Sequence, residues 1–512
     1  MLFKAEIPGM PFKQWIWKET ENKRLLIFSV VIIAIQFAWF KFYYPLPNFM
    51  PPDSDSYVEA AYNNSTISMW AVGYSQFLRF VSCFTSSHFA LTLIQYLLLE
   101  GSLLYLLYTL RYLLLPGKWV FRTLITCSAL NPLVPHISNF VSSDALFTAL
   151  SLVWFTQLLW ILYKPTKPLL VWHAFVLLFA FMVRYYALFY PVISISVIIF
   201  SHTTTKLKLI GSCLVVLLLG AFIGQTTYQY YVTTKTIQYS PFGGWLMAAN
   251  ALYGYAYAPP DAVKDVPAKF RELHAIVNRH METIRHQHPR PDEEVAIYYV
   301  WDKQSPLKTY LQQQYAKDST TPYFLRWASV APLYTAYGRY LILKHPWLFI
   351  KHYLWPNFVK YYAPPPKFMG FYNLKEPTVP QLTAKWFGWK DNRVWARNKE
   401  RTILITGAFS ILSAVINLVF ILIFAGFIYL GSFKRCSVLS RRILWWTFLI
   451  WVSNMGFSVF TAPIELRYQL FPIFITFNFC LIIIECMVRE NIVEEHVPRS
   501  DAILVPRFSN TI

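Results

Sequence analysis

The 512-residue sequence contains little charge: 14% of its residues are Asp, Glu, Lys or Arg, whereas 56% are hydrophobic. Soluble domains carry about 25% charged residues, so this chain has too few of them to cover a water-facing surface. The same composition excludes intrinsic disorder, which requires low hydrophobicity. Repeated apolar runs of roughly 20 residues instead indicate a polytopic membrane protein.

Glycine and cysteine are also scarce, with 17 and 6 residues respectively. Transporters and channels use glycine for close helix packing and broken helices, and many transporters contain internal repeats. The low glycine content and the lack of an evident repeat both weigh against a transporter fold. The cysteines form no CxxC pair and none lies between residues 230 and 400, so we expect no disulfide framework or cysteine metal site.

The apolar runs predict an all-α membrane protein with about ten transmembrane helices, or up to twelve. The runs lie near residues 25–42, 88–110, 119–134, 145–163, 168–183, 186–201, 209–229, 402–430, 443–461 and 468–488. Residues 323–362 are ambiguous because basic residues interrupt two further apolar stretches. We interpret these stretches as interfacial helices rather than as an additional membrane hairpin.

Basic residues are unevenly distributed among the segments that connect the spans. If the N-terminus is inside, lysine and arginine concentrate in the cytoplasmic segments, and the short outer loops hold only Lys41, Arg79, Arg184 and Arg467. This asymmetry follows the positive-inside rule. The sequence therefore predicts an even number of spans, with both termini in the cytoplasm.

The spans divide the chain into four parts. Residues 1–230 form an N-terminal transmembrane module whose first outer loop is 43–87, and residues 231–401, called the insertion below, form a mostly helical outer-face domain. Residues 402–488 form the last transmembrane helices, and 489–512 form a cytoplasmic tail.

Helical spacing of apolar residues is evident within the insertion. The residues in this pattern are Phe270, Leu273, Val277, Met281 and Ile284. Their spacing predicts one amphipathic helix. A second helix is expected to begin near Pro291, where proline is followed by two acids.

The first outer loop carries two acids, Asp53 and Asp55, just before an apparent helix. Two carboxylates this close in sequence can converge on one ligand where the chain is still irregular. Acids at the outer mouth of an apolar bundle can act as a base or as metal ligands. Alternatively the acids only solvate the loop or cap the helix, with Ser54 or Asp55 as the capping residue.

Further polar residues are predicted to lie on the same face. Asp144 opens the fourth span, Arg184 occupies the turn between spans five and six, and Glu465, Arg467 and Tyr468 precede the last span. Each has an ordinary structural explanation as a helix cap, a snorkelling side chain or an ion pair. Because they recur on one side, we predict a site for an anionic headgroup at the outer rim.

This combination resembles the C-type (GT-C) superfamily of integral-membrane glycosyltransferases, which includes protein O-mannosyltransferases and the aminoarabinose transferase of lipid A. The family has an acidic motif in its first outer loop, and Asp53-Ser54-Asp55-Ser56-Tyr57 followed by Ala60-Ala61 is similar to it. Residues 70–78 resemble the next family stretch, GYP-x-FL, with Ser75 in place of proline. The chain departs from the family in having aspartate at Asp144, where glutamate is common, and in its insertion, which matches no recognisable family segment.

The resemblance implies transfer of a sugar from a polyprenyl-phosphate donor to a lipid, glycan or protein acceptor at the outer face of a bacterial plasma membrane. A carboxylate should take the acceptor proton, with Asp53 as the first candidate and Asp55 as the second. Arg184 and Arg467 should hold the donor phosphate, because guanidinium forks suit phosphate oxygens. These two side chains should therefore lie close together.

Tyr57, Asp144, Glu465 and Tyr468 complete the expected substrate-binding residues. Asp53, Asp55 and Asp144 could instead bind a divalent cation, since oxygen ligands favour Mg, Mn or Ca. The expected partners are the bilayer and the lipid-linked donor, with no nucleic acid. Two alternatives stay open: a transferase similar to O-antigen ligases or polymerases, and a lipid-linked glycan flippase or transporter, which should carry charged residues in mid-membrane.

Overall fold

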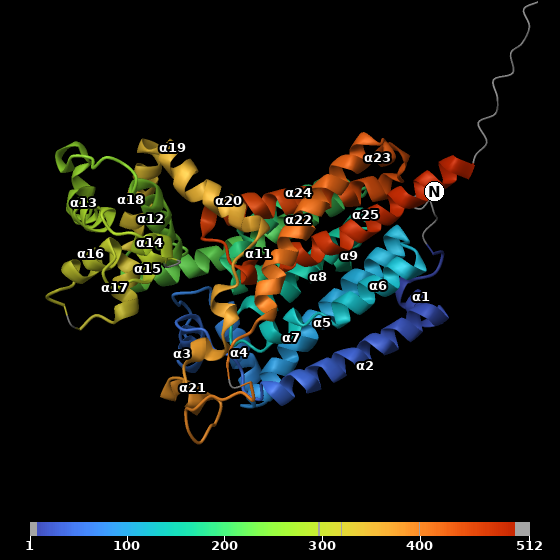
Figure 1. Cartoon of the computed structure of the whole chain (residues 1–512), viewed down its shortest axis with the longest axis horizontal. Coiled ribbons are helices and arrows are strands. Elements are labelled where there is room, and N and C mark those ends of the chain that lie inside the picture. The colour runs from blue at the N-terminus through green and yellow to red at the C-terminus, as the bar shows by residue number, and fades with distance from the viewer. Residues whose placement is uncertain (1–7, 295–296, 319, 399, 497–512) are drawn as a thin grey trace, which may run out of the picture.

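The computed structural model describes residues 8–294, 297–318, 320–398 and 400–496. Within these ranges the chain is helical, and strand-type pairing is limited to three isolated bridges. Figure 1 shows a long helical bundle with the helices of the insertion gathered at one end. The predicted all-α fold class is confirmed.

Seven helices of the described chain are long and apolar enough to cross a membrane. They are α2 (Thr20–Tyr43), α5 (His88–Leu114), α8 (Asp144–Tyr163), α11 (Thr205–Thr234), α22 (Ile405–Tyr429), α24 (Val438–Thr461) and the Leu470–Arg489 part of α25 (Leu470–His496). Two shorter apolar helices, α9 (Lys167–Val183) and α10 (Tyr190–Phe200), match two further predicted spans. The structure is thus that of a helical membrane protein, whereas the predicted count of about ten spans is not confirmed.

The predicted span at 119–134 is not one continuous helix. α6 (Lys118–Ala129) ends just before Pro132, and α7 (Leu133–Ser138) is a separate short helix. Proline has no backbone N–H to donate and disfavours helical geometry in the residue before it, so it ends a helix that the apolar composition alone would continue.

The remaining elements are short and mostly connect or cap the bundle. They are α1 (Phe12–Lys18), α3 (Asp53–Tyr62), α4 (Gly73–Ser82), η2 (Tyr185–Phe189), α12 (Pro241–Tyr255), η3 (Val263–Asp265), η4 (Ala268–Phe270), α13 (Arg271–Arg285), α14 (Pro291–Glu294), α15 (Tyr298–Trp301), α16 (Pro306–Gln314), α17 (Tyr323–Ser329), α18 (Ala331–Lys344), α19 (Pro346–Phe349), η5 (Ile350–Leu354), α20 (Trp355–Tyr362), η6 (Lys367–Gly370), η7 (Tyr372–Lys375), α21 (Gln381–Trp386), α23 (Ser432–Arg435) and η8 (Leu466–Tyr468).

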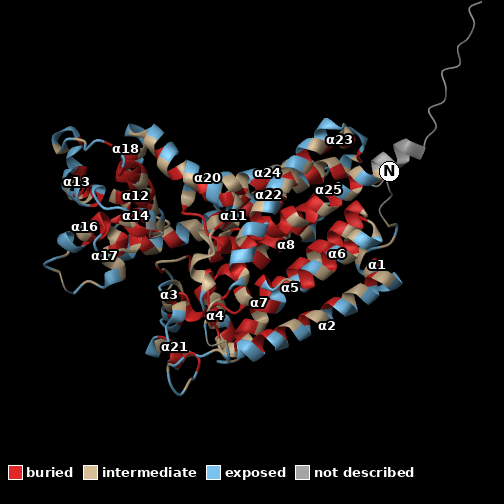
Figure 2. Cartoon of the chain, in the orientation of Figure 1, coloured by how far each residue is buried: buried red, intermediate tan, exposed pale blue. Residues whose placement is uncertain are grey.

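Two hydrophobic cores organise these elements. The larger core fills the bundle, and the second lies inside the insertion. Figure 2 shows the buried residues of both cores in red. The predicted amphipathic helix is confirmed as α13, whose apolar stripe is buried in the second core. The predicted helix start at Pro291 is also confirmed, by the short helix α14.

Residues 323–362 contain no long membrane hairpin. They form α17 to α20 and the π-helical segment η5, none of which meets the length of a membrane span. α18 packs along α12 in the second core, and α20 contacts α24 of the bundle. This stretch therefore joins the insertion to the bundle.

The first loop and the insertion lie at the same end of the bundle, opposite α1 and α23 (Figure 1). α4 reaches this position by a close approach to the end of α9, since a Cβ on Gly73 would lie 2.5 Å from the carbonyl carbon of Met182. The predicted tail 489–512 falls mostly outside the described residues, although α25 continues to His496.

Candidate functional site

Asp53 and Asp55 do not converge on one ligand, contrary to expectation. Both lie within α3, which begins at Asp53. Residues two apart on a helix are related by about 200° of rotation about the helix axis, so they lie on nearly opposite faces. Asp53 lines the pocket between the bundle and the insertion, whereas Asp55 is not among its lining residues. Burial, followed by the charges of Asp53 and Glu59, raises the pKa of Asp55 to about 6.

The alternative that Ser54 or Asp55 caps this helix is wrong as well. Pro52 precedes α3, and no side chain caps it. The buried Ser54 hydroxyl instead accepts a hydrogen bond from the Met50 N–H and donates to the Val141 carbonyl, both at 2.8 Å. These bonds fix the start of α3 against the segment that leads into α8.

Arg467, in η8 just before α25, is the centre of the site. Its Nη1 lies 2.7 Å from Asp53 Oδ2, its Nε donates to Glu465 Oε2 at 2.8 Å, and its Nη2 donates to the Tyr468 hydroxyl at 2.7 Å. Burial lowers the pKa of this guanidinium, but the neighbouring Tyr468, Glu465 and Asp53 raise it well above its ordinary value. Arg467 is therefore a fixed positive charge with every nitrogen bound.

Asp144 joins the two arginines, and the expectation that Arg184 and Arg467 lie close together is confirmed. Arg184 forms an ion pair with Asp144 Oδ1, and Arg467 Nη1 lies 3.8 Å from Asp144 Oδ2. The Asp144 side chain is fully buried and also accepts a 2.7 Å hydrogen bond from Ser142. The guanidinium groups of Arg184 and Arg467 lie 4.9 and 4.7 Å, respectively, from the centre of the Tyr468 ring.

Tyr57 extends the site along α3. Its hydroxyl lies 3.0 Å from the Ser143 hydroxyl, one residue before Asp144, and its ring lines the same pocket as Asp53. The predicted residues Asp53, Tyr57, Asp144, Arg184, Glu465, Arg467 and Tyr468 are thus brought together. Asp55 is the predicted residue that does not line this pocket.

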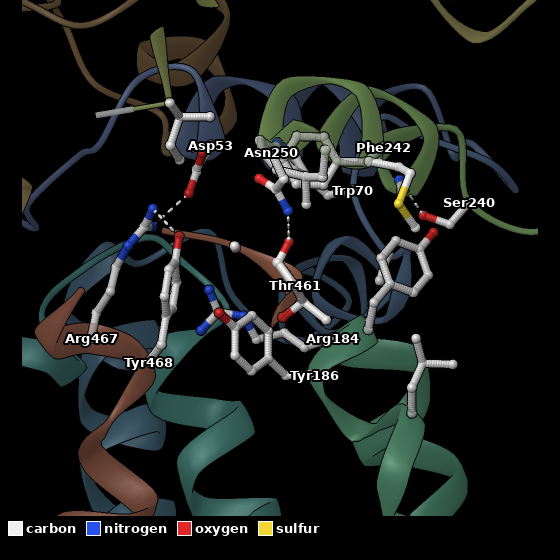
Figure 3. Close-up of a pocket in the computed structure, with 18 of the residues that line it drawn as sticks. Asp53, Trp70, Arg184, Tyr186, Ser240, Phe242, Asn250, Thr461, Arg467 and Tyr468 are labelled. Atoms are coloured by element: carbon white, nitrogen blue, oxygen red, sulfur yellow. Dashed lines mark hydrogen bonds and ion pairs between the residues drawn. The ribbon is translucent and has the colours of Figure 1, made fainter. Parts of the chain in front are cut away.

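The pocket itself has a volume of about 290 Å³ and lies between the end of the bundle and the insertion. Figure 3 shows Asp53, Arg467 and Tyr468 on one side of it, with Trp70, Phe242 and Ser240 across from them. Its other lining residues are mostly aromatic or aliphatic. The pocket therefore combines a charged wall, formed by Asp53, Arg184 and Arg467, with a largely apolar remainder.

Sequence reasoning missed the part of the pocket that the insertion supplies. Phe242, Asn250 and Trp301 line the pocket from α12 and α15, far in sequence from the first loop. Trp70 is the first residue of the 70–78 stretch that resembles the family motif, and the motif does not predict a place in the pocket. Nothing in the local pattern distinguishes these aromatic residues from the many others in a chain that is 19% aromatic.

The alternative role of Asp53, Asp55 and Asp144 as a divalent-cation site is not supported. In the described ranges, no three His, Cys, Asp or Glu side chains come together as a metal-binding group. Asp55 faces away, while Asp53 and Asp144 bind arginines. These donors do not fit a divalent cation in this arrangement.

Comparison of the chain with protein-family models, curated proteins and solved structures finds no match. The resemblance to GT-C glycosyltransferases consequently rests on short motifs.

Proposed function

We propose that the protein is a membrane glycosyltransferase, which moves a sugar from a polyprenyl-phosphate donor to an acceptor at the extracytoplasmic face of the plasma membrane. The observation that carries this proposal is the placement of Asp53, Arg184 and Arg467 on one wall of an otherwise apolar pocket at the ends of apolar helices. A ligand that fits has an anionic group beside an apolar or neutral portion, as a lipid-linked phosphosugar does.

Charge balance supports exchange of a ligand phosphate for Asp53. In the structure three carboxylates, Asp53, Asp144 and Glu465, share two guanidinium groups. The Asp53 side chain is 13% exposed, whereas those of Asp144 and Glu465 are 0% and 1% exposed. Asp53 is therefore the carboxylate that an incoming phosphate displaces, and the four groups left behind are formally neutral.

The released Asp53 carboxylate is then available as the general base. The acceptor hydroxyl or amine attacks the anomeric carbon and gives its proton to Asp53, while the bond from that carbon to the phosphate oxygen breaks. The phosphate leaves with the bonding electrons, and the guanidinium groups of Arg184 and Arg467 stabilise its growing charge.

The flippase alternative is less well supported. A flippase should present charged residues along a path through the bilayer. The charged residues that line this pocket lie at the ends of α9 and α25 and in the first loop. A ligase-like transferase would share the same chemistry and would differ in its acceptor.

The decisive experiment compares lipid-linked sugars and cell-surface glycans by mass spectrometry in cells with the wild-type chain, with Asp53→Asn, and without the protein. Asn keeps the size of Asp53 but cannot take a proton, so transfer should fall by about 10²–10⁴-fold. Asp55→Asn is the matched control and should retain activity, because Asp55 lies outside the pocket.

A loss smaller than roughly tenfold in Asp53→Asn would contradict the assignment of the base. Translocation of a lipid-linked sugar without transfer would favour the flippase. If Asp55→Asn alone abolishes transfer, the order of the two acids is wrong.

A further inference from the structure

We propose that the side of the pocket opposite the charged wall is a binding subsite for a neutral sugar ring. It consists of Trp70, Phe242, Trp301 and Asn250, which we call the aromatic subsite. The role of this subsite in sugar transfer rests on the proposed function. Sugar binding to the subsite can be tested without any transfer activity.

Three aromatic rings from distant segments meet in this subsite. The Trp70 and Phe242 ring centres are 4.5 Å apart, those of Trp70 and Trp301 are 5.9 Å apart, and those of Phe242 and Trp301 are 6.2 Å apart. The face of an aromatic ring carries partial negative charge, which attracts the polarised C–H groups on one face of a pyranose. Such rings bind sugars without requiring a charge on the ligand.

The rings are held in place by the core of the insertion. Phe242 stacks with the fully buried Trp327 at 6.3 Å between ring centres. Lys308 Nζ lies 5.4 Å from the ring centre of Trp301 and 4.9 Å from that of the buried Trp245. A platform fixed before the ligand arrives loses little conformational freedom on binding, which favours affinity.

Asn250 supplies a hydrogen-bond acceptor whose orientation is forced. Its Nδ2 donates to the carbonyls of Phe460 and Thr461, at 3.2 and 3.0 Å, and carbonyl oxygens can only accept. The amide therefore cannot be flipped. Its Oδ1, which Figure 3 shows directed toward the side of Asp53, has no hydrogen-bond partner in the described structure although Asn250 is only 4% exposed.

Trp70 supplies the complementary donor. The indole Nε1–H is buried and has no acceptor among the described residues, and an indole nitrogen can only donate. Leaving a buried donor or acceptor unpaired is unfavourable, and a ligand with both hydroxyl hydrogens and hydroxyl oxygens would satisfy both groups. An acceptor, a donor and aromatic faces without a charge together match a neutral polyhydroxylated ring better than a lipid chain or an anion.

The position of the subsite relates it to the charged wall. Trp70 lies 6.5 Å between ring centres from Tyr57, which belongs to the same helix as Asp53. A sugar on the aromatic subsite is thus next to the predicted base. It belongs either to the lipid-linked donor or to an acceptor glycan, and both present the same chemistry to these residues.

The first test measures sugar binding to the purified full chain in detergent by saturation-transfer NMR, with the methyl α-glycosides of mannose, glucose and galactose as probes. At least one should bind, and Trp301→Ala should weaken its binding by about tenfold or more. Trp70→Phe keeps an aromatic ring but removes the N–H, so it should also weaken binding. This variant provides the test if Trp301→Ala fails to fold. Trp355→Ala is the control, because Trp355 is 61% exposed on α20 and does not line the pocket.

The proposal is overturned if none of the three glycosides binds to the wild-type chain. It is equally overturned if Trp70→Phe and a folded Trp301→Ala bind as tightly as the wild-type protein and Trp355→Ala. Binding that is sensitive to these variants in a chain with no transfer activity would support the subsite and reject the glycosyltransferase. Transfer that is lost in Asp53→Asn but unchanged in the subsite variants would do the opposite.

A second measurement identifies the source of the sugar. In an active preparation, the folded subsite variants should raise the KM of one substrate and not the other. A higher KM for the lipid-linked donor assigns the subsite to the donor sugar, and a higher KM for the acceptor assigns it to the acceptor glycan. Unchanged KM and kcat for both substrates would reject a role in either.

Discussion

On the charged wall of the pocket, Arg467 has all three of its nitrogens bound to Asp53, Glu465 and Tyr468. On the aromatic subsite, Asn250 Oδ1 and Trp70 Nε1 have no partner within the described structure. Asp53, Arg467 and Tyr468 line the same pocket as Asn250 and Trp70. They differ in whether their polar groups are satisfied before a ligand arrives.

Electrostatics explains this difference. A buried charge without a partner costs far more than a buried neutral polar group, so arginines and carboxylates in a pocket must neutralise one another. Neutral groups can remain unpaired at a cost of about 1–3 kcal/mol each. A ligand therefore has to displace a group on the charged wall, whereas on the aromatic subsite it only has to fill vacant hydrogen-bonding positions.

The largest effect on stability is expected from breaking the charged wall at Arg467. Arg467→Ala leaves Glu465 and Asp144 buried with too little positive charge, and removing one partner of a buried ion pair costs about 3–5 kcal/mol. Thermal unfolding of the detergent-purified protein should show a clear drop in midpoint. Arg467→Lys keeps the charge but not the planar fork, so it should be less destabilising and still lower transfer.

Arg393→Ala is the matched control for this change. Arg393 pairs with Asp391 at 2.7 Å, but its side chain is 77% exposed, and ion pairs between exposed side chains contribute little to stability. Equal losses of stability in Arg393→Ala and Arg467→Ala would contradict the central role of Arg467.

An intermediate effect is expected from two glycines, each of which supports one side of the pocket. A Cβ on Gly338 would lie 2.5 Å from the Met247 carbonyl oxygen on α12, and one on Gly73 would lie 2.5 Å from the Met182 carbonyl carbon, two residues before Arg184. Either glycine-to-alanine change should therefore cost about 1–3 kcal/mol through overpacking.

Function should separate these two glycine variants. Gly338→Ala displaces α12 and should weaken sugar binding more than phosphate-dependent binding, whereas Gly73→Ala should do the reverse. Gly220→Ala on α11 is the control, because its added Cβ would meet nothing within 4 Å. Binding of a phosphorylated and a neutral sugar, each measured by saturation-transfer NMR, distinguishes the variants. Identical losses for both ligands would indicate that the two sides of the pocket are not independently supported.

The smallest effect concerns Asp55, the acid on the opposite face of α3 from Asp53. Burial raises its pKa from 3.8 to about 6, so the folded protein binds this proton more tightly than the unfolded chain does. The contribution of Asp55 to stability is therefore present at low pH and is lost as pH rises through this window. Asp55→Asn cannot ionise, so it should be more stable than wild type at pH 7 and equal to it below pH about 4. Unfolding midpoints measured across this pH range check the sign, and a variant less stable than wild type at pH 7 would contradict it.

Local pattern was enough to predict much of the helical framework. The apolar runs predict the long helices because burial in lipid requires about 20 apolar residues, and the spacing from Leu273 to Ile284 predicts the buried face of α13. Hydropathy predicts one span at 119–134 where the structure has the separate helices α6 and α7, because hydropathy does not register the helix break at Pro132. It also placed Asp53 and Asp55 together, because it did not foresee that α3 begins at Asp53.

Local sequence pattern is therefore sufficient to predict most of the helices and the charged residues at their ends, because hydrophobic periodicity and charge act over a few turns of chain. The contact of Arg467 with Asp53, 414 residues earlier, and those of Trp70 with Phe242 and Trp301 from the insertion follow from the tertiary fold alone. Such contacts depend on how whole helices pack against one another. Close approaches at Gly73 and Gly338 set that packing, and no local pattern specifies which distant backbone each glycine will meet.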